Sequence, residues 1–207
     1  MTKVRLFLIA CLLAAIGFGG WFLYARRNTV TTQRLSYDDS CRRLQQLGYL
    51  GPNQFPPLPA HGPSYGDEEP LGLSFFRTFI GDGDGHLDNL SIPRTFFGRS
   101  EIRSISFRNT DLSESCLCWN DFINVDFTDA LLASSDLRAS NFERAKFVRT
   151  DLRKADLRRS TFLECDFTGA LLNGAKLDQG NELLEILSEQ QKSVLDYQPE
   201  GEYPPGG

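Results

Sequence analysis

Histidine is scarce in this sequence, because only His61 and His86 occur among its 207 residues. Two histidines leave little material for histidine-based catalysis or for a common type of zinc site. A strong charge of either sign is also missing, since the formal net charge is −5. Such mild acidity argues against broad affinity for nucleic acid phosphates. Neither a Gly-x-Ser-x-Gly motif nor a phosphate-binding glycine loop occurs, so the sequence gives no catalytic or nucleotide-binding signature.

One long apolar run stands near the amino terminus, from residue 6 to residue 25. At about 1.5 Å per residue it would span ~30 Å, the thickness of a bilayer core. An uncleaved anchor over residues 1–27 is favoured over a cleaved signal peptide, because no small-x-small site follows the run. Basic residues flank both ends in nearly equal number, which leaves the opposite orientation open. A short charged tail usually stays in the cytoplasm, so we predict a single-pass bacterial inner-membrane protein with a periplasmic repeat domain.

Residues 28–86 read as a linker and a small amino-terminal segment. A short helix is expected after Ser36 as its N-cap, ending at Gly48. A proline- and glycine-rich loop follows, then the strand "LSFFRTFI" and the turn "GDGDG". The acids around that turn resemble a calcium loop, but Leu87 stands where an EF-hand needs glycine, so a turn is favoured. The segment either caps the next domain or lies along one of its faces.

From Leu87 onward, large apolar residues recur at every fifth position. Neither a helix nor a strand keeps that spacing on one face, whereas short strands that turn once in every five residues do. A Phe-Phe-Leu-Leu order repeats every twenty residues, so like residues stack on like residues if each coil has four sides. Residues 87–180 are therefore predicted to form a β-solenoid of nearly five coils. Its predicted core consists of Phe107, Leu112, Leu117, Phe122, Phe127, Leu132, Leu137, Phe142, Phe147, Leu152, Leu157, Phe162, Phe167, Leu172 and Leu177.

A second inward position lies two residues before each large one. Between Ala130 and Ala175 it holds only Ala, Ser, Thr or Cys, because little room is left beside the large side chains. Ile105, Asn120 and Val125 depart from this rule. We expect the coils that contain them to be wider or irregular.

Units such as "ADLRR" at 155–159, "SDLRA" at 135–139 and "SNFER" at 140–144 resemble the pentapeptide-repeat family, whose unit approximates A(D/N)LXX. The resemblance implies an all-β fold, a right-handed quadrilateral β-helix, and leaves function open because members serve varied roles. Some members imitate DNA and bind topoisomerase through a strongly acidic surface. Residues 97–180 here carry 13 acids and 12 bases, so that use is the less favoured one.

The solenoid needs covers at its ends, since open strand edges invite aggregation. Residues 181–197 are predicted to form a helical cap, with a capping box made by Ser188 and Gln191. Residues 198–207 then read as a flexible tail.

The cysteines allow two interpretations. Cys116 and Cys118 flank the inward Leu117, so both are expected to point outward, where Cys41 could bridge to one of them in an oxidising compartment. Ordinary unpaired thiols are the alternative. Cys165 occupies a small inward position and is expected to be buried. No metal site and no cofactor is predicted.

The outward positions hold two notable groups of residues. Eight basic residues lie between Arg138 and Arg159, and the coil spreads them over all four sides, which favours a solvated surface over a nucleic acid or lipid patch. Five apolar residues stand where the repeat expects polar ones: Trp119, Ile123, Leu131, Leu163 and Leu171. Cover by the amino-terminal segment, through Phe75, Phe76 and Phe79, is favoured, and a partner site is the alternative.

The sequence thus favours a non-catalytic, membrane-tethered protein-binding module that presents a rigid β-helix. An immunity-type protein that sequesters an envelope-acting toxin is one concrete form. A structural spacer or scaffold in an inner-membrane complex is the alternative. The expected partners are the membrane and a protein, with no nucleic acid and no small-molecule substrate.

Overall fold

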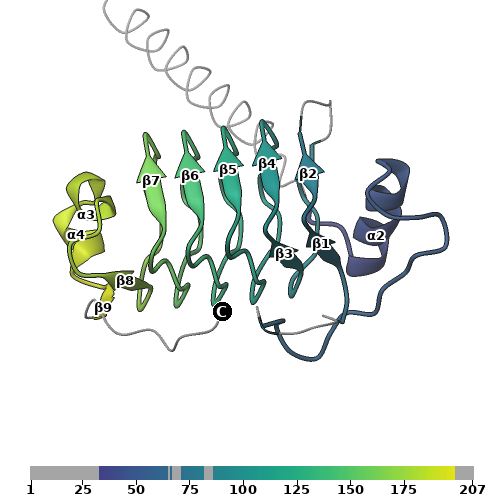
Figure 1. Ribbon diagram of the computed structural model, residues 1–207, viewed down its shortest axis with the longest axis horizontal. Helices are drawn as coiled ribbons and strands as arrows, with labels where there is room; N and C mark the ends of the chain where they lie inside the picture. The colour runs from purple at the N-terminus through teal and green to yellow at the C-terminus, as the bar shows by residue number, and fades with distance from the viewer. Residues whose placement is uncertain (1–32, 65, 67–70, 82–85, 199–207) are drawn as a thin grey trace, which may run out of the picture. The chain divides into compact units, whose positions relative to one another are not determined.

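The computed structural model describes residues 33–64, 66, 71–81 and 86–198. Its strands are short, and each pairs in parallel with the strand one coil away. Phe122 lies opposite Phe142, and Phe142 lies opposite Phe162, so the regular coil holds twenty residues. Figure 1 shows the strands of successive coils side by side in one stack. The described residues therefore form an all-β solenoid of about six turns with helices at its ends.

The coil has four walls, which we number in chain order. Wall 1 contains β1 (Ser74–Phe76), β3 (Phe96–Gly98), β8 (Lys176–Asp178) and β9 (Asp196–Gln198), with bridges through Cys116, Asp136 and Asp156 between β3 and β8. Wall 2 contains β2 (Phe79–Ile80), β4 (Glu101–Arg103), β5 (Asp121–Ile123), β6 (Asn141–Glu143) and β7 (Thr161–Leu163). Single bridges hold wall 3, through Ser106, Asp126, Lys146 and Asp166, and wall 4, through Asp111, Leu131, Asp151 and Leu171.

The predicted columns of large residues form the core of this solenoid. All fifteen predicted core residues, from Phe107 to Leu177, are buried. Phe122 stacks on Phe142 with ring centroids 4.9 Å apart, and Phe142 stacks on Phe162 at 5.3 Å. Like residues therefore stack on like residues, as the twenty-residue period predicts.

A residue with positive φ turns the chain at every corner, and this is how a period of five becomes possible. Asn124, Asp129 and Ser134 are successive examples, with φ of 54°, 60° and 58°. A left-handed conformation costs a non-glycine residue about 1 kcal/mol. The corner amides offset that cost by bonding to the next coil, as the Asp129 amide does to the Val148 carbonyl at 3.0 Å. In the last regular coil, Gly169 takes a corner without this penalty.

The solenoid begins earlier than predicted. Phe75 lies opposite Phe97 and stacks on it at 4.7 Å, so residues 73–81 belong to the first coil and not to a linker. Phe75 is an inward core residue, which corrects its expected role as an outward cover. Ile80 and Leu87 are seven positions apart where the repeat requires five. This two-residue insertion hides the first coil from a strict five-residue pattern, and about six coils replace the nearly five predicted.

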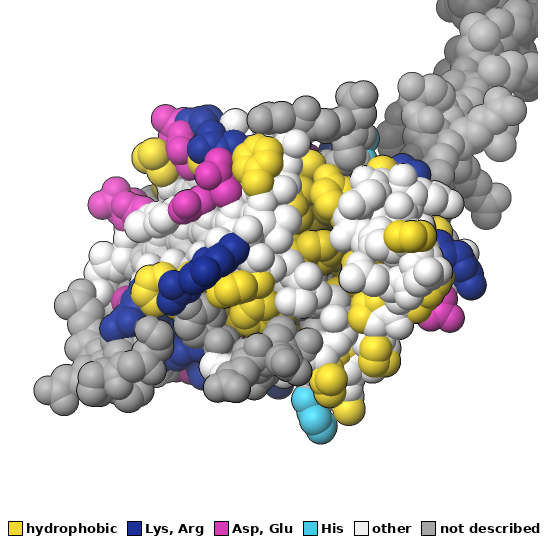
Figure 2. Space-filling model, turned by 45° about the vertical axis from the view of Figure 1, so that its right-hand side comes forward, with side chains coloured by type: hydrophobic (Ala, Val, Ile, Leu, Met, Phe, Trp, Pro, Cys, Tyr) yellow, Lys and Arg dark blue, Asp and Glu magenta, His cyan; other side chains and the backbone are white. Residues whose placement is uncertain are grey.

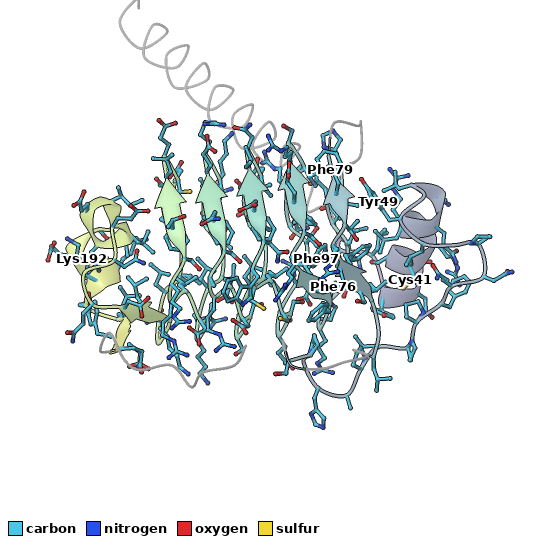
Figure 3. All side chains as sticks on the ribbon, in the orientation of Figure 1. Cys41, Tyr49, Phe76, Phe79, Phe97 and Lys192 are labelled. Atoms are coloured by element: carbon cyan, nitrogen blue, oxygen red, sulfur yellow. The ribbon has the colours of Figure 1, made fainter. Side chains whose placement is uncertain are left out.

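A helix covers the amino-terminal end of the solenoid, as Figure 1 shows. This is α2 (Tyr37–Gln46), which Ser36 caps as predicted, and Gly48 follows its end with a φ of 80°. Cys41 and Leu44 of the helix are buried in the same core as the coils. Figure 3 labels Cys41 on the helix and Phe97 in the second coil.

The proline- and glycine-rich loop lies along the coil next to α2. Arg94 donates through Nη1 to the Pro59 carbonyl at 2.8 Å. A Cβ added to Gly62 would lie 2.3 Å from the Glu114 carbonyl oxygen, so only glycine permits this close approach. The amino-terminal segment therefore both caps the end and lies along one side, two roles that the sequence left as alternatives. The predicted turn at 82–85 lies outside the described residues.

The carboxy-terminal segment consists of two short helices and a strand, which replaces the continuous helical cap expected over residues 181–197. The helices are α3 (Leu183–Ile186) and α4 (Glu189–Lys192), and they lie at the opposite end of the solenoid from α2 (Figure 1). Ser188 and Gln191 form the predicted capping box. Leu183 and Leu187 are buried in the core. β9 pairs with β8, so the predicted tail begins within a strand at Gln198.

The predicted anchor over residues 1–27 lies outside the described residues and stays a prediction, as does residue 199 onward of the tail. Across the part of the chain that the structure describes, no helix has the length and apolar character needed to cross a membrane.

Candidate protein-binding surface

The five outward apolar residues do not gather into one patch. Ile123 and Leu163 share a row on wall 2, whereas Leu131 and Leu171 share a row on wall 4. Trp119 stands at the corner after wall 1. Trp119, Leu163 and Leu171 remain 47%, 58% and 47% exposed, and Ile123 and Leu131 are half-buried. The favoured expectation of cover by the amino-terminal segment is therefore wrong for the three most exposed residues.

Two phenylalanines of the first coil point outward instead of providing that cover. Phe76 lies on wall 1 and Phe79 on wall 2, and both remain about half exposed. Arg77 lies over the Phe76 ring, with its guanidinium carbon 5.2 Å from the ring centroid. Figure 3 labels both phenylalanines near the amino-terminal end of the coil.

The cysteines differ from the predicted arrangement. Cys116 and Cys118 lie on the outer side of wall 1, the direction that the repeat predicts, but both are buried there with Phe96. Their Sγ atoms lie 2.9 Å apart. Cys41 is buried on the inner face of α2 and forms no bridge to either of them. Burial raises the pKa of the Cys165 thiol to about 11, although this residue is less buried than its inward position predicts.

Basic and acidic side chains pair over the surface of the coil. Ion pairs join Arg138 to Asp136 and Arg158 to Asp156 on wall 1, Arg153 to Asp151 on wall 4, and Arg149 to Asp129 between walls 3 and 4. On the face that Figure 2 displays, acidic and basic side chains lie next to one another. The basic residues are therefore part of a charge-balanced surface and do not form a patch of one sign.

One of these ion pairs predicts how the stability of the fold depends on pH. A hydrogen bond from Arg153 is the main cause that holds the pKa of Asp151 below its usual value. A carboxyl with a lower pKa in the folded chain binds fewer protons there, so it stabilises the fold above its unfolded pKa of about 3.9 and loses this effect as pH falls through the folded pKa. We expect Asp151→Asn to lower the free energy of unfolding by about 0.5–1 kcal/mol at pH 7, and this loss should shrink as pH falls through the folded pKa of Asp151. Denaturation by urea across this pH range measures it.

Arg153→Gln is the matched control for that measurement, because it removes the other half of the same pair. Its free energy of unfolding should follow the same pH profile as Asp151→Asn. A deficit in Asp151→Asn that did not shrink as the pH was lowered below the unfolded pKa of about 3.9 would contradict the ion-pair explanation.

A groove of about 690 Å³ opens at the carboxy-terminal end of the solenoid. Residues 165–173 of the last regular coil line one side, and Ile186, Gln191 and Val194 of the end segment line the other. Leu171 and Ile186 each expose about half of their side chains there. We call this site the carboxy-terminal groove. Of the five predicted partner residues, only Leu171 lies in it.

The end segment satisfies part of the strand edge that faces this groove. The Gln191 side chain donates through Nε2 to the Phe167 carbonyl at 2.9 Å and to the Ala170 carbonyl at 3.3 Å. The Gly174 amide donates to the Val194 carbonyl at 2.7 Å. These contacts replace the bonds that a further coil would make.

The rest of that edge makes no backbone hydrogen bond to another coil within the residues that the structure describes. One coil earlier, the amides of Phe147, Arg149 and Leu152 donate to the carbonyls of the following coil. Their counterparts in the last regular coil are the amides of Phe167, Gly169 and Leu172. Among the described residues these three amides donate no hydrogen bond. No sequence signal marked this edge, because it depends on where the end segment leaves the coil.

The geometry can be compared with known proteins. The family model for pentapeptide repeats, in eight copies, matches residues 121–159, 135–174 and 150–181. No curated protein sequence matches the chain.

Three solved structures are similar to part of the chain. The pentapeptide repeat protein Rfr23 from the cyanobacterium Cyanothece 51142 is 20% identical over 53% of this chain and 84% of its own, with a TM-score of 0.46. The pentapeptide repeat protein alr5209 from Nostoc Pcc 7120 is 25% identical over 50% of this chain and 84% of its own, with a TM-score of 0.43. QnrB1, a plasmid-mediated fluoroquinolone resistance protein, is 15% identical over 65% of this chain and 68% of its own, with a TM-score of 0.45. The family model for pentapeptide repeats thus matches residues 121–181, and the coils in that range have the twenty-residue register.

Proposed function

We propose that this protein is a non-catalytic protein-binding module that receives an extended segment of a partner protein in the carboxy-terminal groove. The observation that carries the proposal is this strand edge, where three amides have no hydrogen-bond partner among the described residues and lie beside two half-exposed apolar side chains. A strand edge of this kind pairs with an added strand, whose backbone supplies the missing hydrogen bonds and whose side chains supply selectivity.

The positions of the free amides define the partner segment. Phe167 lies on wall 3, Leu172 lies on wall 4, and Gly169 forms the corner between them. A bound segment must therefore be extended along one wall, turn at the corner, and offer carbonyl oxygens to all three amides. Leu171 and Ile186 favour an apolar side chain on that segment.

The proposed binding site occupies only the end of the solenoid, so the four walls are considered separately. The ion pairs on these walls are satisfied within the chain, which favours a structural spacer or scaffold as the alternative function. A spacer would not require the open edge to bind anything. The two functions therefore differ in what the groove does, and experiments on the groove distinguish them.

The proposal includes a membrane tether, which rests on the apolar run at residues 6–25. A tethered module with a periplasmic solenoid is suited to sequestering a protein at the bacterial envelope, and an immunity-type protein against an envelope-acting toxin is one form of this. Protease accessibility in cells with a permeabilised outer membrane tests the orientation. Digestion of the solenoid, with a cytoplasmic control protected, supports it; protection that is lost on lysis contradicts it.

Hydrogen exchange tests the open edge in the free protein and with its partner. We expect the amides of Phe167, Gly169 and Leu172 to exchange much faster than those of Phe147, Arg149 and Leu152, their bonded counterparts. Addition of the partner should protect the first three amides and leave the others unchanged. Equal protection of both sets in the free protein would contradict an open edge.

Matched surface variants identify the partner site. The full-length protein, carrying a photo-crosslinking residue in place of Gln190, captures partners in its own cells, and each captured protein is then purified for titration. Leu171→Asp should weaken its binding at least about tenfold, because a charge would face an apolar contact. Leu163→Asp, equally exposed on wall 2, should leave binding unchanged. Loss of binding in Leu163→Asp alone would contradict the groove and place the partner on wall 2, whereas capture of nothing from position 190 would favour the spacer function.

A further inference from the structure

Two thiols replace an ion pair on wall 1. In successive coils this wall holds Asp136 with Arg138 and then Asp156 with Arg158, and each pair is in direct contact across one intervening residue. Bridges along the wall place Cys116 in the row of Asp136 and Asp156. In that earlier coil, Cys116 and Cys118 stand where the later coils have their acid and their base.

The geometry points to a metal site formed by Cys116, Cys118 and Asp136, which binds a thiophilic divalent cation such as Zn²⁺. The two Sγ atoms and a carboxylate oxygen all lie within 4.8 Å of one another. The Sγ atoms are 2.9 Å apart. Two sulfurs on one tetrahedral zinc ion, each at about 2.3 Å from it, lie about 3.8 Å apart, so a movement of about 1 Å gives the two thiols the separation of zinc ligands. Carboxylate and thiolate are both zinc ligands.

The charges around the site favour a divalent ion. Binding breaks two S–H bonds, releases both protons to solvent and forms two metal–sulfur bonds, with no change of oxidation state. Two thiolates and one carboxylate carry three negative charges, and Arg138 beside them carries one positive charge. With a divalent cation bound, the sum of these charges is zero. A neutral group is the arrangement that a buried site tolerates.

Arg138 also orients the carboxylate ligand. Its Nε donates to Asp136 Oδ1 at 2.8 Å and its Nη2 donates to Oδ2 at 2.7 Å. The Arg138 amide donates to Oδ1 as well, at 3.1 Å. Oδ2 therefore keeps a lone pair free for a cation. Metal-bound carboxylates are commonly held in this way by a second set of hydrogen bonds.

The surroundings exclude water from the thiols. Cys116 and Cys118 are buried against Phe96. The proline-rich loop contacts the corner just before them, through Arg94 and Gly62. A metal ion here would hold two adjacent coils together at the place where the loop meets the solenoid. Among the described residues, no other group of three side chains has this arrangement.

Cobalt titration tests the site on the full-length protein, purified in detergent under anaerobic reducing conditions. Co²⁺ serves as a spectroscopic substitute for Zn²⁺. We expect one equivalent of Co²⁺ to produce a sulfur-to-metal charge-transfer band, and one equivalent of Zn²⁺ to displace it. Cys116→Ser and Cys118→Ser should each abolish the band. Asp136→Asn should weaken Co²⁺ binding by about tenfold to a hundredfold.

Controls and a second measurement keep the result interpretable. Cys41→Ser and Cys165→Ser remove the other described thiols and should leave the titration unchanged. Zn²⁺ should raise the unfolding temperature of the wild type but not that of Cys118→Ser. The assignment is overturned if the reduced wild type gives no band, or if the band survives Cys118→Ser. It is also overturned if the two thiols are recovered from acid-quenched cells as a disulfide with each other.

Discussion

Phe147→Ala should lower the free energy of unfolding by about 3–5 kcal/mol, because it empties the centre of the core. Phe147 is fully buried in a middle coil. Its ring stacks on Phe127 at 5.3 Å and on Phe167 at 4.6 Å between centroids. Neighbouring coils constrain both partners, so the cavity cannot collapse without shifting the backbone ladder. Urea denaturation monitored by circular dichroism measures the loss.

Phe79→Ala is the matched control, since it removes the same atoms from a ring that is 54% exposed on wall 2. We expect a change of about 0.5 kcal/mol or less for this variant. Equal losses in the two variants would contradict the stacked column as the source of stability. A loss near zero for Phe147→Ala would contradict the four-sided coil itself.

The stacked column was predictable because its physical cause is periodic. Each wall of the coil has room for one inward side chain as large as phenylalanine. The fold is therefore visible in the sequence as an uninterrupted five-residue period of large apolar residues. The same argument fails at the first coil, where the insertion between Ile80 and Leu87 breaks the phase of the five-residue period. Structural pairing of Phe75 with Phe97 persists across the insertion, because loops absorb extra residues at little cost.

The alternation of inward and outward positions predicted which way each side chain points, but not whether that side chain is buried. Cys116 and Cys118 do lie on the outer side of the wall, yet both are buried, in a small cluster with Phe96. The carboxy-terminal groove escaped prediction for a related reason. Its free amides depend on where α3 and α4 leave the coil, and a capping pattern such as that of Ser188 and Gln191 fixes a helix end without fixing its position in space.

The inward position two residues before each large one was predicted to need a small side chain. The repeat does not show that side chains at this position also form hydrogen bonds. Asn120 was expected to disturb the coil, but it lies in a regular register and is buried. Its Nδ2 donates to the Phe97 carbonyl at 2.9 Å, and its Oδ1 accepts from the Ser100 amide at 2.8 Å. Ser140 occupies the same position one coil later, where its hydroxyl donates to the Leu117 carbonyl at 2.8 Å and accepts from the Asn120 amide.

This column therefore joins each coil to the one before it by side-chain hydrogen bonds inside the core. No buried side-chain nitrogen or oxygen among the described residues lacks a partner. A small polar residue fits beside the large rings and also satisfies backbone groups that the corner leaves unpaired. This position thus requires a side chain that is both small and polar, and the repeat pattern reveals only the requirement for a small one.

Asn120→Ala should lower the free energy of unfolding by about 2–4 kcal/mol, because it leaves the Phe97 carbonyl and the Ser100 amide buried without partners. Asn141→Ala is the control: Asn141 is exposed on wall 2, where its bonds to Asp121 and Thr161 face solvent, and its loss should change stability by about 0.5 kcal/mol or less. Urea denaturation of the two variants under one set of conditions makes the comparison. If Asn120→Ala is as stable as Asn141→Ala, the inward column contributes only by being small, and the polar ladder adds nothing to the stability of the solenoid.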